Sequence, residues 1–447
     1  MEKTDVIAAL ASASGRAAIG VVRLSGPDLR RFFPPLLGRE SVEPRHATLA
    51  RFLDAAGAPI DVGLALYFPA PRSYSGEDML ELHAHGGPEV LRLVLGRCLE
   101  LGARPAEPGE FTRRAFLNDR LDLLQAEAVA DLIEASSSAA ARSAVRSLSG
   151  EFSQRIHNLV ETLVELRALV EACIDFPEEG LDLLSERGGR QRLDALRAEL
   201  EGIGRAARSG SLLREGAHVV LFGRPNVGKS SLLNRFAGDE VAIVTDVPGT
   251  TRDALRELIH LEGVPIHIVD TAGLRSTADK VETIGISRTW RALGSADLGL
   301  LVIDATLGES GEDLQFLEQL APEIPRIVVF NKIDLTGELP AVRRDQSRTE
   351  VRVSAQTGAG LDLLQDEILL RIGWQPQEEG VFLARTRHLR CLRDAAGHLA
   401  EAAAQLDQLE LFAEELRLAQ VALSQITGAF TSEDLLGEIF SRFCIGK

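Results

Sequence analysis

A glycine-rich loop constrains the fold of this chain more than any other stretch. Residues 221–234, LFGRPNVGKSSLLN, follow an apolar β-branched run and open a helix-like segment. They fit the pattern G-x-x-x-x-G-K-[ST] with Gly223, Gly228, Lys229 and Ser230. In this pattern the glycines let backbone N–H groups wrap phosphates, the lysine reaches the β and γ oxygens, and the serine can ligate Mg²⁺. The loop therefore predicts a strand, a phosphate site and a helix in succession.

Three further motifs extend the phosphate site to a nucleotide base. DTAG, residues 270–273, ends a strand where Asp270 can reach Mg²⁺ through water. NKID, residues 331–334, follows RIVVF, and Asp334 offers two acceptor oxygens to the ring N–H and amino group of guanine. Adenine has no matching pair of donors. In SAQTG, residues 354–358, the backbone of Ser354 and Ala355 can support the guanine oxygen. The order of these motifs predicts a GTP-binding domain.

The switch segment TDVPGTTRD, residues 245–253, lies between the phosphate loop and DTAG. Thr251 is expected to bind Mg²⁺ together with Ser230 and to sense the γ-phosphate, with an ordinary polar loop as the alternative for Thr250 and Thr251. The predicted GTP-binding residues are Asn226, Val227, Gly228, Lys229, Ser230, Ser231, Thr245, Thr250, Thr251, Asp270, Thr271, Ala272, Gly273, Asn331, Lys332, Asp334, Ser354 and Ala355.

The residue after Gly273 is Leu274, where Ras-like enzymes carry the glutamine that orients the attacking water. Three substitutes are open: a residue of a partner, a side chain from the following segment, or a cation in place of an arginine finger. Glu282 is the candidate side chain, although a glutamate early in a helix is also favoured by the helix dipole. Arg275 is either a surface ion-pair residue or an anchor for Glu282. The amide oxygen of Asn226 could ligate a monovalent cation beside the phosphates.

The 447 residues are too many for one ordinary domain. Residues 1–120 mix short strand-like runs with glycine and proline turns, which predicts an α+β domain. Residues 121–213 are alanine- and leucine-rich amphipathic segments typical of a helical bundle. Residues 214–375 alternate apolar runs with helical segments, as in a parallel sheet covered by helices. Helical sequence returns in 376–447, so we expect the α/β domain to be inserted into one helical domain.

Composition narrows the classes of protein further. The net charge of −17 argues against a surface that binds nucleic acid everywhere, and residues 1–120 are neutral, with 15 Arg plus Lys against 15 Asp plus Glu. No run of eighteen apolar residues occurs, so no membrane span is expected. The four cysteines are scattered, without zinc-site spacing, which favours a reducing, cytoplasmic location.

Several motifs together resemble a known family. GRPNVGKSSLLN, TDVPGTTRD, DTAGLR, GEFTRRAFLNDRLDL and the terminal FCIGK are similar to those of the MnmE (TrmE) tRNA-modification GTPases, and the resemblance covers essentially the whole chain. It implies an N-terminal folate-binding domain that forms a homodimer, a helical domain and an inserted Ras-like P-loop GTPase domain. It also implies a complex with the FAD protein MnmG, a heterotetramer, that modifies C5 of the wobble uridine in certain tRNAs by carboxymethylaminomethyl addition.

The resemblance also implies roles for particular residues. Glu282 would be catalytic, with Arg275 beside it, and a tetrahydrofolate derivative would supply the one-carbon unit. Potassium would be bound by Asn226, Thr245, Val247 and Thr250. The folate would be bound by Arg23, Glu81, Arg120 and Lys447. Arg120 stands where some relatives have lysine, and the two cations differ in geometry. For Cys444, a thiol role competes with that of a small buried apolar side chain.

Two alternative functions and one alternative site accompany this interpretation. A regulatory GTPase of ribosome assembly, which modifies no base, would carry the same nucleotide motifs. The flanking sequence argues against it, because the N-terminal domain is neutral and is no RNA-binding module. A membrane-transport GTPase is disfavoured by the lack of spans. His83 and His85 share one side of a predicted strand and could suggest a metal pair, but without a third ligand in view we expect a structural role.

Overall fold

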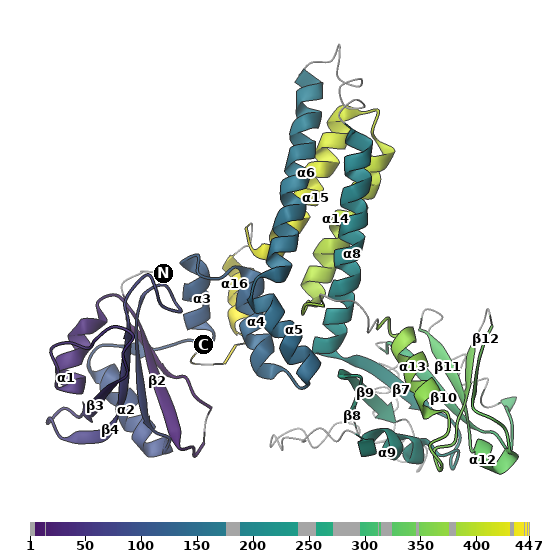
Figure 1. Ribbon diagram of the computed structural model, residues 1–447, viewed down its shortest axis with the longest axis horizontal. Helices are drawn as coiled ribbons and strands as arrows, with labels where there is room; N and C mark the ends of the chain where they lie inside the picture. Colours follow the sequence, from purple (N-terminus) through teal and green to yellow (C-terminus); the bar gives the residue numbers. More distant parts are fainter. Residues whose placement is uncertain are drawn as a thin grey trace, which may run out of the picture. The chain divides into compact units, whose positions relative to one another are not determined.

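The structure is a computed structural model (Figure 1). It describes residues 5–13, 15–175, 188–239, 256–270, 296–311, 313, 324–345, 348–374, 381–429, 433–441, 443, 444 and 446. Contacts divide the chain into two compact units, one made of Met1–Ile133, Ser147–Leu193 and Gly397–Lys447, the other of Glu134–Arg146 and Asp194–Ala396. Ten predicted site residues lie outside the described residues: Thr245, Val247, Thr250, Thr251, Thr271, Ala272, Gly273, Arg275, Glu282 and Lys447.

The first unit begins with a six-stranded, mostly antiparallel sheet of order β3-β4-β5-β2-β1-β6. Its strands are β1 (Ile7–Leu10), β2 (Ile19–Gly26), β3 (Thr48–Leu53), β4 (Pro59–Phe68), β5 (Asp78–His85) and β6 (Arg104–Pro105). The short helices η1 (Leu29–Phe32) and α1 (Phe33–Leu37) and the longer α2 (Pro88–Glu100) supply side chains to its core. The predicted α+β class of this region is confirmed.

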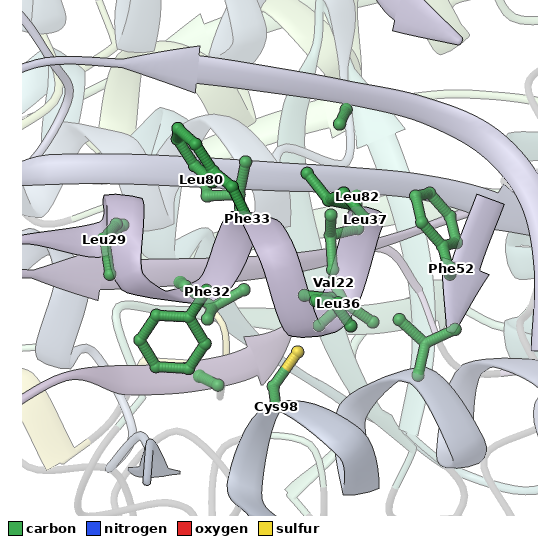
Figure 2. Packing of buried hydrophobic residues seen from close by; sticks show 14 of the residues in the cluster. Val22, Leu29, Phe32, Phe33, Leu36, Leu37, Phe52, Leu80, Leu82 and Cys98 are labelled. Carbon is green, nitrogen blue, oxygen red and sulfur yellow. The ribbon is translucent and has the colours of Figure 1, made fainter. Parts of the chain in front are cut away.

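One face of this sheet is the hydrophobic core of the domain. Phe32, Phe52, Leu82 and Cys98 are buried together there, from η1, β3, β5 and α2 (Figure 2). Burial raises the pKa of the Cys98 thiol to about 12, so this cysteine is a packing residue. Because strand side chains alternate, the residues next to these core positions face the opposite side of the sheet.

An ionic cluster built around the buried side chains of Arg114 and Glu110 ties Asp5 to α3 (Glu110–Leu117). The guanidinium of Arg114 pairs with Asp5, Glu77 and Glu110 at 2.9–3.0 Å, and Arg104 bridges Asp5 and Glu110. Burial opposes ionisation of Asp5 and Glu110, but the hydrogen bonds from the two arginines outweigh it, so the pKa of each carboxyl is lowered. All members are partnered, and the cluster fixes α3 against β1 and β6.

The helical part contains α4 (Leu123–Glu134), α5 (Ser138–Leu148), α6 (Glu151–Asp175), α8 (Gly189–Glu215), α14 (Thr386–Ala404), α15 (Leu409–Thr427) and α16 (Glu433–Ser441). Ile156, Leu159, Leu163 and Leu166 form the buried stripe of α6, which packs along α15. This spacing of three and four residues is the helical periodicity expected from the sequence.

The second sheet is the α/β core of the inserted domain. Its strands are β7 (Ala217–Phe222), β8 (Arg256–Leu261), β9 (Val264–Asp270), β10 (Leu298–Asp304), β11 (Arg326–Asn331), β12 (Ala341–Arg344) and β13 (Thr349–Arg352). The order is β12-β13-β11-β10-β7-β9-β8, parallel except for the two edge strands β8 and β12. After β9 the chain crosses to the other side of β7 to form β10. Ligands of such sheets bind where the strand order reverses, at the carboxyl ends of the strands.

The helices of this domain in the described part are α9 (Lys229–Asp239), α12 (Ile333–Thr336) and α13 (Leu361–Arg371). The chain enters the domain from α8 and leaves it toward α14, and these two connections touch. A Cβ on Gly210 would lie 1.8 Å from the carbonyl oxygen of Phe382. Thr386 hydrogen-bonds Glu215 at 3.3 Å. The α/β domain is therefore inserted between helical segments, as predicted.

Gly210→Ala is expected to destabilise the protein by about 2 kcal/mol, because the added methyl group would collide with backbone that cannot swing away. The matched control is Gly202→Ala in the same helix, where the added Cβ would meet only the end of the Arg205 side chain at 3.9 Å. That change should be neutral or stabilising by roughly 0.5–1 kcal/mol. Denaturant unfolding of both variants checks this, and equal midpoints for the two would contradict it.

Candidate functional site

The phosphate loop joins β7 to α9 at the reversal of the second sheet. Gly223 has φ +141° and lies so close to β10 that a Cβ would be 2.2 Å from the carbonyl oxygen of Val302. Gly228 has φ +96°, and its Cβ would be 2.3 Å from Nδ2 of Asn331. Only glycine fits these two positions, which explains the spacing read from the sequence.

Lys229 lies at the mouth of this loop, with 6% of the residue exposed. Its Nζ donates to the carbonyl oxygens of Gly223 at 2.8 Å and Arg224 at 3.0 Å. Ser230 and Ser231 follow in the first turn of α9, and both are exposed. The first turn of a helix points N–H groups and a partial positive charge outward. An ammonium, two hydroxyls and a helix N-terminus thus meet at one place, which suits an anionic phosphate.

Asn331, at the end of β11, joins the phosphate loop to the predicted guanine loop. It is 2% exposed, its Nδ2 donates to the carbonyl oxygen of Val227 at 2.9 Å, and its Oδ1 accepts from the N–H of Ala355 at 2.9 Å. Both ends of the amide are therefore satisfied by backbone from two separate loops. This one side chain fixes the distance between the phosphate end and the base end of the site.

Lys332 makes a second link between the same two ends. Its Nζ donates to the carbonyl oxygen of Asn226 and to Oδ2 of Asp304, both at 2.7 Å. Burial of Asp304 opposes ionisation, but hydrogen bonds from Lys332 and Thr306 outweigh it and lower the pKa of this carboxyl. Asp304 was not singled out from the sequence. The sequence does mark this residue, because Asp304 is the acidic residue that ends the apolar run LGLLVID, as Asp270 ends the run before it.

The base end is formed by Asp334 and Ser354. The hydroxyl of Ser354 donates to Oδ1 of Asp334 and accepts from the N–H of Thr357, the latter at 3.1 Å. Ser354 is fully buried, whereas Asp334 is exposed. The serine therefore orients a carboxylate that faces outward, as recognition of two neighbouring guanine donors requires.

Arg224 is a further residue that the sequence did not flag. Its guanidinium donates to the carbonyl oxygen of Gly308 at 3.1 Å and pairs with the buried Asp313 at 3.2 Å. It thereby anchors the phosphate loop to the segment after β10.

Of the predicted nucleotide residues, the structure brings together those of the phosphate loop, NKID and SAQTG. Asp270 ends β9 next to β7, but its side chain and the switch residues lie outside the described part.

A second polar cluster lies on the face of the N-terminal sheet opposite its main core, beside the small apolar cluster of Phe111 and Tyr74. Arg23 on β2 is directly opposite Glu81 on β5, and its Nε and Nη2 donate to Oε1 at 2.9 and 2.8 Å. His83 contacts Oε2 of Glu81 at 3.3 Å. The rings of Tyr74 and Phe111 each have their centroid 5.8 Å from the Arg23 guanidinium carbon. Two predicted folate residues are thus in contact and partly exposed, at 22% and 17% of their side chains.

The C-terminal motif reaches this cluster. Arg23 Nη1 donates to the carbonyl oxygen of Gly446 at 3.4 Å, and the carbonyl oxygen of Cys444 accepts from the N–H of Gly109 at 3.4 Å. Cys444 is exposed and forms no disulfide with another described cysteine, so the alternative of a buried apolar side chain does not apply. Arg120 is exposed and lies beside Gly76. Within the described residues, it makes no hydrogen bond or ion pair with Arg23 or Glu81.

The two histidines have different partners. His85 contacts Asp61 at 2.8 Å, whereas His83 contacts Glu81. In the part of the chain that the structure describes, no group of three His, Cys, Asp or Glu residues could hold a metal ion. No helix within that part is both long and apolar enough to span a bilayer.

A phosphate loop at the sheet reversal defines a P-loop GTPase domain, since Asn331 ties it to the loop whose Ser354 orients an outward carboxylate. Residues 6–120 match the family model described as the GTP-binding protein TrmE N-terminus, and residues 123–444 match that of the MnmE helical domain. The chain belongs to the MnmE (TrmE) family of tRNA modification GTPases. The predicted family, multidomain fold and GTPase class are therefore confirmed.

Three relatives called tRNA modification GTPase MnmE show how far the similarity extends. The protein of Azoarcus sp. (strain BH72) is 59% identical over 447 residues, that of Aromatoleum aromaticum 58% over 445, and that of Chromobacterium violaceum 56% over 441. Each alignment covers 99% of this chain and 98% of the relative.

Asp334→Asn is expected to weaken GTP binding roughly 100-fold, about 3 kcal/mol, because the charge is lost and one acceptor oxygen becomes an N–H donor that faces a guanine donor. Xanthine carries a carbonyl where guanine has its amino group, so the new amide N–H should favour xanthosine triphosphate. Competition of both nucleotides against a fluorescent GTP analogue measures the change. An unaltered preference for GTP would show that Asp334 does not read the base.

Proposed function

We propose that this protein hydrolyses GTP and uses the hydrolysis to drive modification of C5 of the wobble uridine in certain tRNAs. It would act with an FAD protein of the MnmG type in a heterotetramer, adding a carboxymethylaminomethyl group with a one-carbon unit from tetrahydrofolate. The observation that carries the proposal is the Asn331 bridge between the phosphate and guanine loops, in a chain whose two flanking regions match this family.

The phosphate site supports binding of GTP with Mg²⁺. The exposed hydroxyl of Ser230 follows Lys229 at the N-terminus of α9, where a hard oxygen ligand is available to a metal held by the phosphates. Thr251 would be the other ligand, with Asp270 acting through water. Bound Mg²⁺ would neutralise charge on the β and γ phosphates. Lys229 would exchange its two carbonyl partners for phosphate oxygens.

The site also fits a monovalent cation. Asn226 has a left-handed backbone, φ +64°, its carbonyl oxygen is held by Lys332, and the residue is exposed. Its side-chain amide oxygen is thus free to turn toward a ligand at the mouth of the loop. We propose that K⁺ binds there, with Thr245, Val247 and Thr250. The positive charge of the ion would take the place of an arginine finger, with Glu282 orienting the water and Arg275 anchoring Glu282.

The Arg23–Glu81 cluster supports a folate site. A partly exposed guanidinium beside two aromatic rings suits a glutamyl carboxylate and a flat heterocycle, and Glu81 can accept from pterin N–H groups. Arg120 and Lys447 would complete the site. Gly446 lies against Arg23, which favours a position for Lys447 at the same cluster. A role for the exposed Cys444 thiol remains a hypothesis beside it.

The same sheet face supports a homodimer. Leu49 and Leu64 are cross-strand partners on β3 and β4, and they are 63% and 38% exposed. Val62 on β4 and Ile19 on β2 are exposed to 46% and 61%. We propose that a second copy covers this apolar face. The cytoplasm would be the location, because tRNA is found there and the three described cysteines other than Cys444 are buried free thiols.

Nucleoside analysis of tRNA from a strain with and without the gene tests the proposed function. Without the gene, the C5-modified wobble uridine should disappear and return with a plasmid copy. Ribosome profiles on sucrose gradients are recorded from the same cultures. Fully modified tRNA with accumulated ribosomal precursors would contradict the proposal and favour a regulatory GTPase of ribosome assembly.

Hydrolysis rates test the cation and the glutamate. Wild-type protein should hydrolyse GTP at least about tenfold faster in KCl than in NaCl, because loss of one charge-stabilising partner costs at least that factor. Glu282→Ala should bind GTP normally and lose turnover in both salts. Equal wild-type rates in the two salts would remove the potassium assignment, and a fully active variant would remove the assignment of Glu282.

A further inference from the structure

The two strands of the hairpin β8–β9 lead in sequence to the two predicted γ-phosphate sensors. β8 begins at Arg256, five residues after Thr251, and β9 ends at Asp270, three residues before Gly273. The strands pair without interruption from Arg256 opposite Val269 to Leu261 opposite Val264. Six residues of strand span about 20 Å. Both switch segments are therefore joined in sequence to the open end of one continuously paired hairpin.

The closed end of this hairpin is a two-residue turn, Glu262–Gly263, with φ +49° and +82°. Positive φ at both positions is the turn type that matches the twist of paired strands. The carbonyl oxygen of Gly263 accepts a hydrogen bond from Ser137 Oγ at 2.9 Å. A Cβ on Gly263 would lie 3.1 Å from Cβ of Ala139. The turn thus touches the start of α5 through a hydrogen bond and through close packing.

Ser137 also caps α5. Its Oγ accepts from the N–H of Ala140 at 3.2 Å while its hydroxyl proton is donated to Gly263. Residues 134–146 belong to the same compact unit as the hairpin, although most neighbouring helical sequence belongs to the other unit. A displacement of the turn therefore acts on the N-terminal cap of a helix outside the GTPase domain.

The hairpin lies at the edge of the sheet, where movement is least restrained. β8 is the terminal strand of the order, and among the described strands it pairs with β9 alone (Figure 1). Leu258 on β8 is 42% exposed. An edge strand can tilt or slide without breaking a second ladder of hydrogen bonds.

We propose that the contact between Gly263 and Ser137 transmits the state of the GTP site to the helical domain. Ser137 follows the end of α4 by three residues, and α4 packs through Leu123, Ala126 and Ala130 against α16 and Phe443. Gly446, three residues beyond Phe443, meets Arg23 of the proposed folate site. The inference goes beyond the proposed function and rests on it, because it supplies a route from hydrolysis to the modification chemistry. Ser137 is a positioning residue in this route.

Two variants break the contact in different ways. Ser137→Asp keeps a strong N-cap for α5 but removes the donor and sets a carboxylate against the Gly263 carbonyl. Gly263→Ala presses a methyl group against Ala139. Its matched control is Gly373→Ala in the same compact unit, which has φ +84° and nothing within 4 Å of the added Cβ. Ser137→Thr retains both hydrogen bonds and should rescue function.

The complete complex with its FAD partner and tRNA is assayed for GTP hydrolysis and for modified uridine in the same tube. Ser137→Asp and Gly263→Ala should hydrolyse GTP within about twofold of wild type, while modified uridine per GTP falls about tenfold, a typical size for coupling between sites. Ser137→Thr and Gly373→Ala should match wild type. Wild-type coupling in Ser137→Asp, or the same loss in Gly373→Ala as in Gly263→Ala, would overturn the inference.

Amide hydrogen exchange separates this inference from the proposed function. A non-hydrolysable GTP analogue should change the exchange of residues 138–144 in the wild-type protein and in Ser137→Thr, but not in Ser137→Asp. An unchanged exchange rate in wild type would overturn the relay even if tRNA is modified. Absence of modified tRNA with wild-type protein, together with the expected exchange pattern, would instead contradict the proposed function.

Discussion

The amide of Asn331 has two hydrogen-bonding ends and almost no access to water, and each end is satisfied by the backbone of a different loop. If one end of a buried amide loses its partner, that end stays desolvated without a compensating hydrogen bond, which costs about 1–3 kcal/mol. A shift of either the phosphate loop or the base loop would therefore break a hydrogen bond of Asn331. Gly228 belongs to the same arrangement, because any side chain there would occupy the place of the Asn331 amide.

Parallel strands explain why so few residues can organise the site. β7, β10 and β11 run parallel, so their carboxyl ends lie side by side. Asp304, Asn331 and Lys332 therefore lie close to one another at these ends. Lys332 spans from Asp304 to the carbonyl oxygen of Asn226, and Arg224 spans from the loop to Asp313. These contacts are all made by the protein itself and hold the loop in the shape of a phosphate cradle. Such preorganisation lowers the free energy spent in ordering a phosphate cradle.

The GTPase domain was the most predictable part, because its chemistry is encoded in short local motifs. Gly223, Gly228, Lys229, Asn331 and Asp334 were all identified from residue type and spacing, and the structure brings them together. Asp313 was missed because its partner, Arg224, is distant in the sequence. Asp304 ends an apolar run and could have been noted as a strand-end acid, but its distant partner Lys332 could not have been named. The same reason applies to Gly446 beside Arg23, since a contact between the two ends of a chain leaves no periodic signal. His83 illustrates a further limit, because strand alternation gave its side of the sheet but not its partner Glu81.

Gly210 and Phe382 place the entrance and the exit of the inserted domain side by side, and Glu215 and Thr386 continue that contact. The inserted domain is therefore attached through two adjacent chain segments that contact each other. The backbone of α8 at Gly210 and that of Phe382 approach so closely that no side chain fits between them. Because the entrance and the exit lie close together, another domain with adjacent termini could replace the insert without a change in the helices that carry it.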